Sequence, residues 1–230
     1  MDSGSIRVAL ARLVKDAALR TGGRGLYQRG SRGGELHSMV RHWANVEEQL
    51  ISWPGTWLGV SVGHLNRRNR TRVRGWERAL RLLGFAAYEP DLWLRPANLR
   101  ASVAELRARM MELGFPGEGL LMEISSLSPA EQWQPDRLWP ISDLERGYQD
   151  NVDRLRDSEA RLKTMAAQAA ARETLLLGRA VTRAILLDPL LPEQLINTQL
   201  RRQMIMAMQH YDQLGKTIWR DFYQRHGRIA

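Results

Sequence analysis

Basic side chains near the amino-terminal end of the chain have a spacing that suits the binding of nucleic-acid phosphates. Residues 1–34 carry seven lysine or arginine residues against two aspartates. Arg7, Arg12 and Lys15 belong to a stretch whose apolar residues recur at helical spacing. Guanidinium and ammonium groups on one side of a helix form charge-assisted hydrogen bonds with phosphate oxygens. The stretch therefore predicts a phosphate-binding surface, and double-stranded DNA is the partner that we expect.

A glycine- and arginine-rich stretch, residues 20–31, follows this helix directly. A basic hairpin after a helix is typical of the second half of a winged helix-turn-helix, in which the helix enters the major groove and the hairpin touches backbone phosphates. We therefore interpret residues 1–34 as a partial winged helix. Its candidate DNA-binding residues are Ser5, Arg7, Arg12, Lys15, Arg24 and Arg29.

Two features of this amino-terminal stretch leave other interpretations open. A solvated helix with a floppy basic loop would carry the same charges, because charge runs usually form solvated faces. A helix-turn-helix also needs roughly three helices to bury its apolar faces, and only one precedes the hairpin, so Ile6, Leu10 and Leu13 lack local partners. Either the chain starts downstream of the true start, or the protein has lost its DNA-binding head and kept a vestige.

The middle of the chain, residues 53–126, has a pattern that predicts a complete small fold. Apolar, β-rich runs alternate with stretches whose apolar residues recur at helical spacing. The order β-α-β-β-α-β predicts a ferredoxin-like sandwich, and the expected fold class is α+β. The predicted elements are a strand at 56–62, a helix at 66–83, strands at 86–88 and 92–95, a helix at 97–113 and a strand at 120–125.

Two connecting segments flank this predicted sandwich. Residues 35–52 form a linker with an amphipathic helix over 35–50, and residues 127–144 form an ordered connector that contains proline and tryptophan. His37 and His42 lie five positions apart in the linker helix. This spacing puts them on different faces, so they make a poor metal-binding pair.

Residues 145–230 are predicted to form a helical carboxy-terminal domain. The alanine-rich run 166–171 should continue the first long helix, because alanine has the highest helix propensity and no breaker is present. Pro189 and Pro192 then force a turn, since each proline disfavours helix at the residue before it. A final helix is expected over residues 193–225.

A second basic cluster lies in and before the first helix of the predicted sandwich. Residues 67–81 carry seven arginines against one carboxylate, Glu77. Such a cluster could bind the phosphates of DNA or of a nucleotide-like effector, and Arg67, Arg70 and Arg74 are the candidates for a weak effector site. A solvated helix face explains the same cluster at least as well.

One residue type and several motifs that support catalysis are missing from the sequence. There is no cysteine, which excludes disulfides, thiol catalysis and Cys-ligated zinc. The first predicted strand is followed by Gly63 and His64, without the carboxylate that a magnesium-dependent nuclease of this architecture needs there. The sequence also contains no P-loop, GxSxG or HExxH motif. We therefore predict that the protein is not an enzyme and uses no metal or cofactor.

The overall composition points to a protein with a polyanionic partner. The 230 residues have a formal net charge of +9 and a pI near 10.7, and 43% of them are hydrophobic, which suffices for a real core. No apolar run approaches the roughly 20 residues that a membrane span needs, and the amino terminus lacks the apolar core of a secretory signal. The composition thus predicts a cytoplasmic protein that does not enter a membrane.

Three segments of the chain resemble the PaaX family, the repressors of phenylacetic acid catabolism. The most specific is AILLDPLLPEQL, residues 184–195, which is similar to the family's Asp-Pro-Leu-Leu-Pro-Glu run between helices. Residues 53–62, with Leu-Gly-Phe at 83–85 and Leu-Trp-Leu-Arg-Pro at 92–96, resemble the middle of the family. IRVALARLV, residues 6–14, resembles the end of its winged-helix head.

This resemblance implies a function for the whole chain. It implies a homodimeric, DNA-binding repressor of a catabolic operon that is released by an aryl-CoA thioester, phenylacetyl-CoA in the founding case. The alternative that we keep open is a headless, non-DNA-binding protein that dimerises with a full-length relative or senses a ligand. Apolar residues without partners in the amino-terminal helix favour that alternative.

Overall fold

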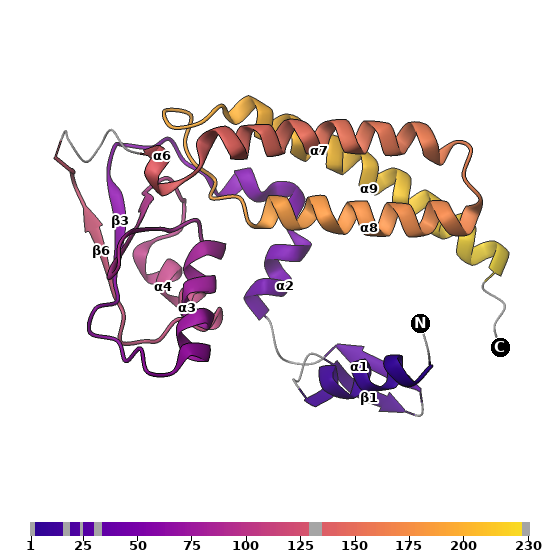
Figure 1. Cartoon of the computed structure of the whole chain (residues 1–230), viewed down its shortest axis with the longest axis horizontal. Coiled ribbons are helices and arrows are strands. Elements are labelled where there is room, and N and C mark those ends of the chain that lie inside the picture. Colours follow the sequence, from indigo (N-terminus) through magenta and orange to yellow (C-terminus); the bar gives the residue numbers. More distant parts are fainter. Residues whose placement is uncertain (1–2, 16–18, 24, 30–33, 129–134, 227–230) are drawn as a thin grey trace.

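The computed structural model describes residues 3–15, 19–23, 25–29, 34–128 and 135–226. It has a mixed α+β structure in which short antiparallel sheets precede a carboxy-terminal region made of long helices (Figure 1). The predicted α+β class and the helical carboxy-terminal region are therefore confirmed. In the part of the chain that the structure describes, no helix is both long enough and apolar enough to cross a bilayer.

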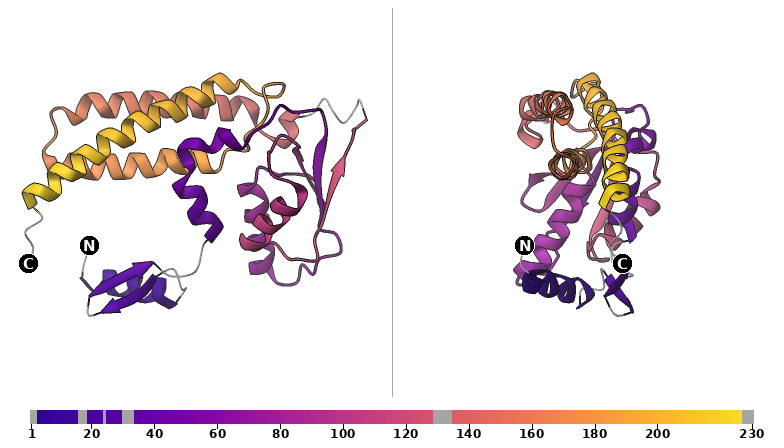
Figure 2. Two further views of the ribbon diagram at one scale, coloured as in Figure 1. Left: turned by 180° about the vertical axis from the view of Figure 1, so that it is seen from behind. Right: turned by 90° about the vertical axis from the view of Figure 1, so that its right-hand side faces the viewer.

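The amino-terminal unit lies apart from the rest of the molecule and consists of one helix and one hairpin (Figures 1 and 2). Its two strands pair antiparallel, with Leu19 opposite Arg29 and Thr21 opposite Tyr27. Gly25 lies between the strands with a φ of 76°, which glycine adopts without steric cost. The elements of this unit are α1 (Ser3–Lys15), β1 (Leu19–Gly23) and β2 (Leu26–Arg29).

The connecting segment between the two sheets is not the single helix predicted over residues 35–50. It contains α2 (Gly34–Arg41) and a 3₁₀ helix, η1 (Trp43–Gln49). His42 separates the two with a φ of −106° and a ψ of 17°. The side-chain amide of Gln209 donates a hydrogen bond of 2.8 Å to the Ala44 carbonyl. Contacts with the last helix of the chain therefore fix η1 and override the helix propensity of the segment.

The central unit is a four-stranded antiparallel sheet with two helices on one face. The strand order is β4-β5-β3-β6, so each helix connects two strands that have another strand between them. The order of elements along the chain is the predicted β-α-β-β-α-β. These elements are β3 (Trp57–Ser61), α3 (Arg70–Leu82), β4 (Ala86–Glu89), β5 (Leu92–Pro96), α4 (Val103–Glu112) and β6 (Leu120–Ile124).

Both helices of the central unit begin later than predicted, because capping side chains fix their first turns. The Asn69 side chain accepts a hydrogen bond of 3.1 Å from the Arg72 N–H, and α3 begins directly after Asn69. Ser102 and Glu105 form a capping box, in which the Glu105 carboxylate accepts a hydrogen bond of 2.8 Å from the Ser102 N–H. The residues that precede these caps are not helical.

The two faces of the sheet are covered by different parts of the chain. On one face the sheet packs against α3 and α4 through Leu58, Val60, Trp76, Leu80, Leu106 and Met110. On the other face, Trp57 stacks on Trp139, with ring centroids 6.4 Å apart and planes 10° apart. Trp139 follows a short helix, α6 (Pro135–Leu138), inside the segment that was predicted to be a connecting loop. This face joins the core of the carboxy-terminal helices.

Three long helices form the carboxy-terminal bundle: α7 (Ile141–Leu162), α8 (Ala167–Leu186) and α9 (Thr198–His226). The prediction that residues 166–171 continue the first of these helices is wrong. The Thr164 N–H donates a hydrogen bond of 3.1 Å to the Arg161 carbonyl, and Ala166 is extended with a ψ of 145°. The turn lets α7 and α8 both pack on α9, so burial of apolar faces prevails over local propensity.

The boundaries of the bundle also differ from those predicted. Helix α7 begins at Ile141, inside the predicted connector. Helix α9 begins at Thr198, five residues after the predicted start at 193. The Pro192 carbonyl accepts a hydrogen bond of 3.0 Å from the Leu195 N–H, which forms a separate turn. The Asn197 side chain then accepts one of 3.1 Å from the Gln199 N–H.

Candidate functional site

Residues 188–192 form a buried turn where the central sheet, the connecting segment and the helical bundle meet. The Asp188 carboxylate accepts a hydrogen bond of 2.7 Å from the Leu190 N–H, which closes the turn. Leu190 has a φ of 54°, a conformation that non-glycine residues rarely adopt. Such a conformation persists where surrounding contacts determine the backbone. The Asp-Pro-Leu-Leu-Pro run is therefore a structural junction.

The central unit meets this turn through a close approach of two backbone segments. Gly84 has a φ of 78°, and a Cβ atom at this position would lie 2.5 Å from the Pro189 carbonyl oxygen. The Asn98 side-chain amide donates a hydrogen bond of 2.8 Å to the Leu190 carbonyl. Only glycine fits at position 84, since any side chain would collide with the turn.

A fully buried guanidinium, that of Arg95, lies behind Gly84. It donates hydrogen bonds to the Leu83 carbonyl, to the Pro96 carbonyl at 3.1 Å and to the Asn98 side-chain oxygen at 3.0 Å. It also lies 5.8 Å from the centre of the Phe85 ring. Burial lowers the pKa of Arg95 to about 9, which leaves the guanidinium charged at neutral pH.

A second buried guanidinium, that of Arg201 in α9, ties the turn to η1. It donates hydrogen bonds of 3.0 Å to the Glu47 carboxylate and 2.9 Å to the Leu191 carbonyl. The Asp188 carboxylate lies 3.8 Å from it. Burial raises the pKa of the Asp188 carboxyl above its ordinary value, although the Arg201 charge favours the ionised form. Burial and the Asp188 charge also raise the pKa of the Tyr148 phenol.

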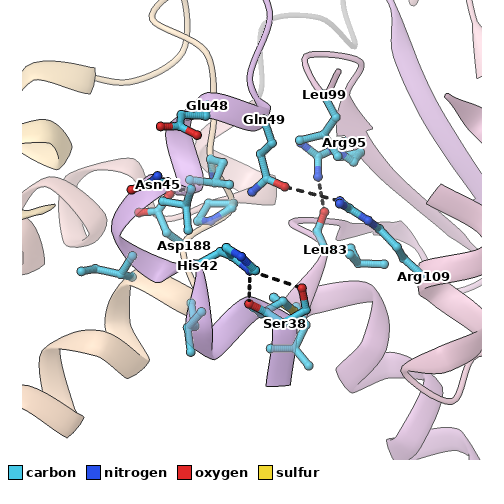
Figure 3. Close-up of a pocket in the computed structure, with 17 residues that line it drawn as sticks. Ser38, His42, Asn45, Glu48, Gln49, Leu83, Arg95, Leu99, Arg109 and Asp188 are labelled. Atoms are coloured by element: carbon cyan, nitrogen blue, oxygen red, sulfur yellow. Dashed lines mark hydrogen bonds between the residues drawn. The ribbon is translucent and has the colours of Figure 1, made fainter. Parts of the chain in front are cut away.

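Next to this junction lies a pocket of about 340 Å³, which we call the junction pocket (Figure 3). Its lining comes from all the units that meet there: Ser38, His42 and Gln49 from the connecting segment, Leu83, Arg95, Leu99 and Arg109 from the central unit, and Ile185, Asp188 and Leu190 from the bundle. A molecule bound here would contact each unit at once.

The polar groups of the junction pocket are arranged around an apolar wall. The His42 Nδ1 lies 2.8 Å from the Ser38 carbonyl oxygen, so this nitrogen carries a hydrogen and donates it to that oxygen. The Arg109 guanidinium donates a hydrogen bond of 3.4 Å to the Gln49 side-chain oxygen. Leu83 and Leu99 contribute apolar surface (Figure 3). This combination suits a small ligand with an apolar body and one polar or anionic group.

Comparison with known proteins gives a fold relationship. No family model matches the chain, and no curated protein matches it. Among solved structures, it is similar to the uncharacterized protein Rv0674 from Mycobacterium tuberculosis, with a TM-score of 0.54 and 17% sequence identity. The similarity covers 95% of this chain and 86% of that chain. At this identity it shows a shared fold, and function has to be argued from the site.

The predicted DNA-binding residues belong to the amino-terminal unit, away from the junction pocket. Arg7, Arg12 and Lys15 are exposed on α1. At 100° per residue they fall within an arc of about 140° of the helix surface. Ser5 and Arg29 lie in α1 and β2, and their side chains fall outside the described part of the structure, as does the whole of Arg24.

The predicted effector-binding arginines do not line the junction pocket. Arg67 donates a hydrogen bond of 2.6 Å to the Pro90 carbonyl and forms an ion pair of 2.9 Å with Asp91, so it fastens the loop before α3 to a turn of the sheet. Arg70 and Arg74 are exposed on α3. The three side chains therefore do not converge on that cavity.

Sequence reasoning missed the roles of two residues that build the junction, Arg95 and Arg201. Arg95 interrupts the apolar run of β5, and an isolated arginine inside a buried strand is a signal that could have been used. Arg201 carries no such signal, because its partner Glu47 lies 154 positions away in sequence. His37, half of the rejected metal pair, has a side chain outside the described part. Among the described residues, no three histidine, aspartate or glutamate side chains gather to hold a metal ion.

Proposed function

We propose that this chain is a DNA-binding transcriptional regulator, similar to the PaaX repressors of catabolic operons. The exposed basic surface of the amino-terminal unit carries the proposal. Arg7, Arg12, Lys15 and Arg20 are all exposed, and the unit lies clear of the sandwich and the bundle, where a duplex can reach it (Figure 2). Cations in such a position displace counterions from the phosphate backbone, which supplies much of the affinity of DNA-binding proteins.

In this proposal the amino-terminal unit acts as a partial winged helix. Helix α1 enters the major groove with Arg7, Arg12 and Lys15 nearest the DNA, and Arg24 and Arg29 bind phosphates from the hairpin. A homodimer presents two copies of α1 to successive major grooves, about 34 Å apart. The repression that results is a property taken from the family resemblance.

The other two units support the same resemblance. The strand order β4-β5-β3-β6, with each helix crossing over one strand, favours a ferredoxin-like sandwich for residues 53–126. The run 184–195, which is the most specific part of the resemblance, contains the buried turn 188–192 at the junction. There is a physical reason for a family motif at this position, because the turn fixes how the central sheet, the connecting segment and the helical bundle pack together.

We place the effector at the junction pocket. The pocket is large enough for the aryl-acyl end of a CoA thioester and lies against α2 and η1, the only described chain segment between the amino-terminal unit and the sandwich. An effector that binds better when α2 is displaced shifts the population away from the DNA-binding arrangement. DNA and effector then weaken each other's binding by the same factor.

A second candidate function is suggested by apolar residues of the amino-terminal unit. Val8 is 71% exposed and Leu26 is 66% exposed. These side chains suit a contact with another protein, so the unit could be an interaction module that pairs with a full-length relative. Sequence-selective DNA binding by this chain alone would exclude that function as the main one.

The experiment that tests the proposal is binding of this chain to DNA from its own promoter region, in competition with nonspecific DNA, at two salt concentrations. We expect selective binding that weakens steeply as salt increases. Addition of phenylacetyl-CoA should release the DNA. Weak binding without preference for the promoter would contradict the regulator and favour the interaction module.

A further inference from the structure

A wide groove lies between α8 and α9, on the side of the bundle that faces α3 and α2. Its volume is about 830 Å³, and most of its surface is apolar. Apolar and aromatic side chains form its floor: Val40, Leu82, Leu175, Leu187, Met208 and Trp219. Leu175 is 55% exposed and Leu187 is 44% exposed, so part of the floor is open to solvent. A cavity of this size and lining is typical of a small-molecule site.

The rim of the groove is basic. Arg78, Arg179 and Arg183 line it with exposed side chains. No ion pair or side-chain hydrogen bond engages these three guanidinium groups within the described part of the chain. The remaining charged pair of the lining, Lys216 and Asp212, is satisfied internally at 2.6 Å. The excess positive charge of the rim is therefore available to a ligand.

Arg179 and Arg183 are four positions apart on α8, so both project from the same side of the helix. Two guanidinium groups at this spacing can bind one phosphate or carboxylate between them. The apolar floor begins one turn away, at Leu175, which lies four positions before Arg179 on the same helix. An anionic group and an apolar body of the same molecule would thus be bound at neighbouring places.

We propose that the groove binds an amphipathic anion, with its anionic group on Arg179 and Arg183 and its apolar body on Leu175, Met208 and Trp219. Leu82 and Leu186 line both this groove and the junction pocket, so the two cavities share part of their lining. The proposal deepens the proposed function, on which it rests for the consequence that binding here affects DNA release. Binding itself is independent of DNA and is tested without it.

The test uses isothermal titration calorimetry of the full chain with three probes: dodecanoate, dodecanol and inorganic phosphate. We expect dodecanoate to bind about tenfold or more tightly than dodecanol, because the paired guanidinium groups add a charge-assisted contact. Phosphate alone should give no measurable heat, since it lacks the apolar body. Equal affinity for dodecanoate and dodecanol would overturn the assignment of the arginines.

Matched variants locate the site. R179Q/R183Q should reduce the affinity for dodecanoate to that for dodecanol, whereas R172Q, an exposed arginine of α8 outside the groove, should leave it unchanged. L175E should abolish dodecanoate binding by placing a carboxylate on the floor. L176E is the control, because Leu176 is 52% exposed on the same helix and does not line the groove. Equal effects of L175E and L176E, with unchanged circular dichroism, would overturn the proposal.

Failure of this proposal and failure of the proposed function give different results. If dodecanoate binds as expected while the chain shows no selective DNA binding, the groove is a ligand site of a protein that is not a regulator. If DNA binds selectively and no variant alters dodecanoate affinity, the regulator stands and the groove assignment is wrong.

Discussion

The Pro189 carbonyl oxygen determines which residue can occupy position 84. This oxygen would lie 2.5 Å from a Cβ atom at that position, which is closer than any real contact of a Cβ atom. The φ of 78° adds a second constraint, because L side chains rarely adopt it. Gly55, in the loop before β3, has a φ of 88° and no atom within 4 Å of its Cβ position. An alanine at position 55 would therefore show the cost of backbone strain alone. An alanine at position 84 would show that cost together with the cost of the close approach to Pro189.

We predict that G84A destabilises the protein more than G55A. G55A should reduce the free energy of unfolding by about 1 kcal/mol, the cost of a left-handed alanine. G84A should reduce it by about 3 kcal/mol, because the turn at Pro189 has to move as well. Urea unfolding followed by tryptophan fluorescence measures both. Equal losses for the two variants would mean that Gly84 and Pro189 do not touch in solution.

The sequence indicated some residues of the junction and not others. Asp188 and Pro189 could be singled out because prolines disfavour helix before them, and Gly84 could be read as a helix stop. Arg95 and Arg201 could not be assigned, since their roles depend on carbonyl groups and carboxylates brought close by the fold. Local charge density indicates Arg67, Arg70 and Arg74, but it does not tell which side chains converge on a cavity.

A polar network of four side chains crosses the helical bundle and connects all three of its helices. The Ser158 hydroxyl of α7 donates a hydrogen bond of 2.9 Å to the Glu173 carboxylate of α8, and so the Tyr211 hydroxyl of α9 is the donor in its 2.7 Å bond to Ser158. Arg161 completes the network with an ion pair of 2.9 Å to Glu173. The hydrogen bonds from Ser158 and Arg161 lower the pKa of the Glu173 carboxyl.

We predict that E173Q lowers stability at neutral pH by about 1 kcal/mol, because the charge-assisted bonds become neutral ones. A carboxylate whose pKa is lowered in the folded state stabilises above its unfolded pKa, near 4.5, and loses this contribution as pH falls through its folded pKa. The difference between wild type and E173Q should therefore vanish in acid. Thermal unfolding from pH 3 to pH 7 measures it.

The control for this prediction is D153N, which alters an exposed carboxylate of α7 that pairs with Arg156 at 3.4 Å. An exposed pair of this kind contributes about 0.5 kcal/mol or less. A pH-independent difference between wild type and E173Q would show that the Glu173 charge has no part in the stability of the bundle.

The kinds of helix and strand were predicted better than their ends. The order of elements in the central unit follows from runs of apolar residues with periods of two and 3.6. Ser102 and Glu105 have the spacing of a capping box, which places the start of α4 after Ser102 and not at the predicted residue 97. The turn after α7 has no such signal in the alanine-rich run. It exists because α8 has to return along α9, which is a property of the packing.

Arg201 joins three parts of the molecule. Its side chain is 2% exposed and contacts Glu47 of η1 and the turn at Asp188. Helix α2 precedes η1 in the chain and connects it to the amino-terminal unit. Arg202 also lies near Glu47, at 3.5 Å, but is 59% exposed. Arg201 and Arg202 therefore share one carboxylate partner, Glu47, but differ in burial. Variants of the two residues can be compared to test the role of the buried arginine.

We predict that R201M lowers the free energy of unfolding by about 3 kcal/mol, because it leaves the buried Asp188 carboxylate without its cation. R202M should change it by about 0.5 kcal/mol or less, as expected for an exposed pair. Chemical unfolding of both variants gives the comparison. R201M should also increase hydrogen exchange in η1, and a similar effect in R202M would contradict the assigned role of Arg201.

The central claim is that the exposed cations of α1 bind DNA, and the salt dependence of binding tests it most directly. Fluorescence anisotropy with a labelled promoter duplex should be compared for wild type, R7Q/R12Q/K15Q and a charge-matched control, R172Q/R220Q/R225Q, whose exposed arginines lie on the bundle. The α1 variant should flatten the log-log salt slope by about 0.9 per lost phosphate contact, or nearly 3 in all, and the control should not change it. Equal slopes for the two triple variants would show that the positive charge acts generically and that α1 is not the DNA-binding element.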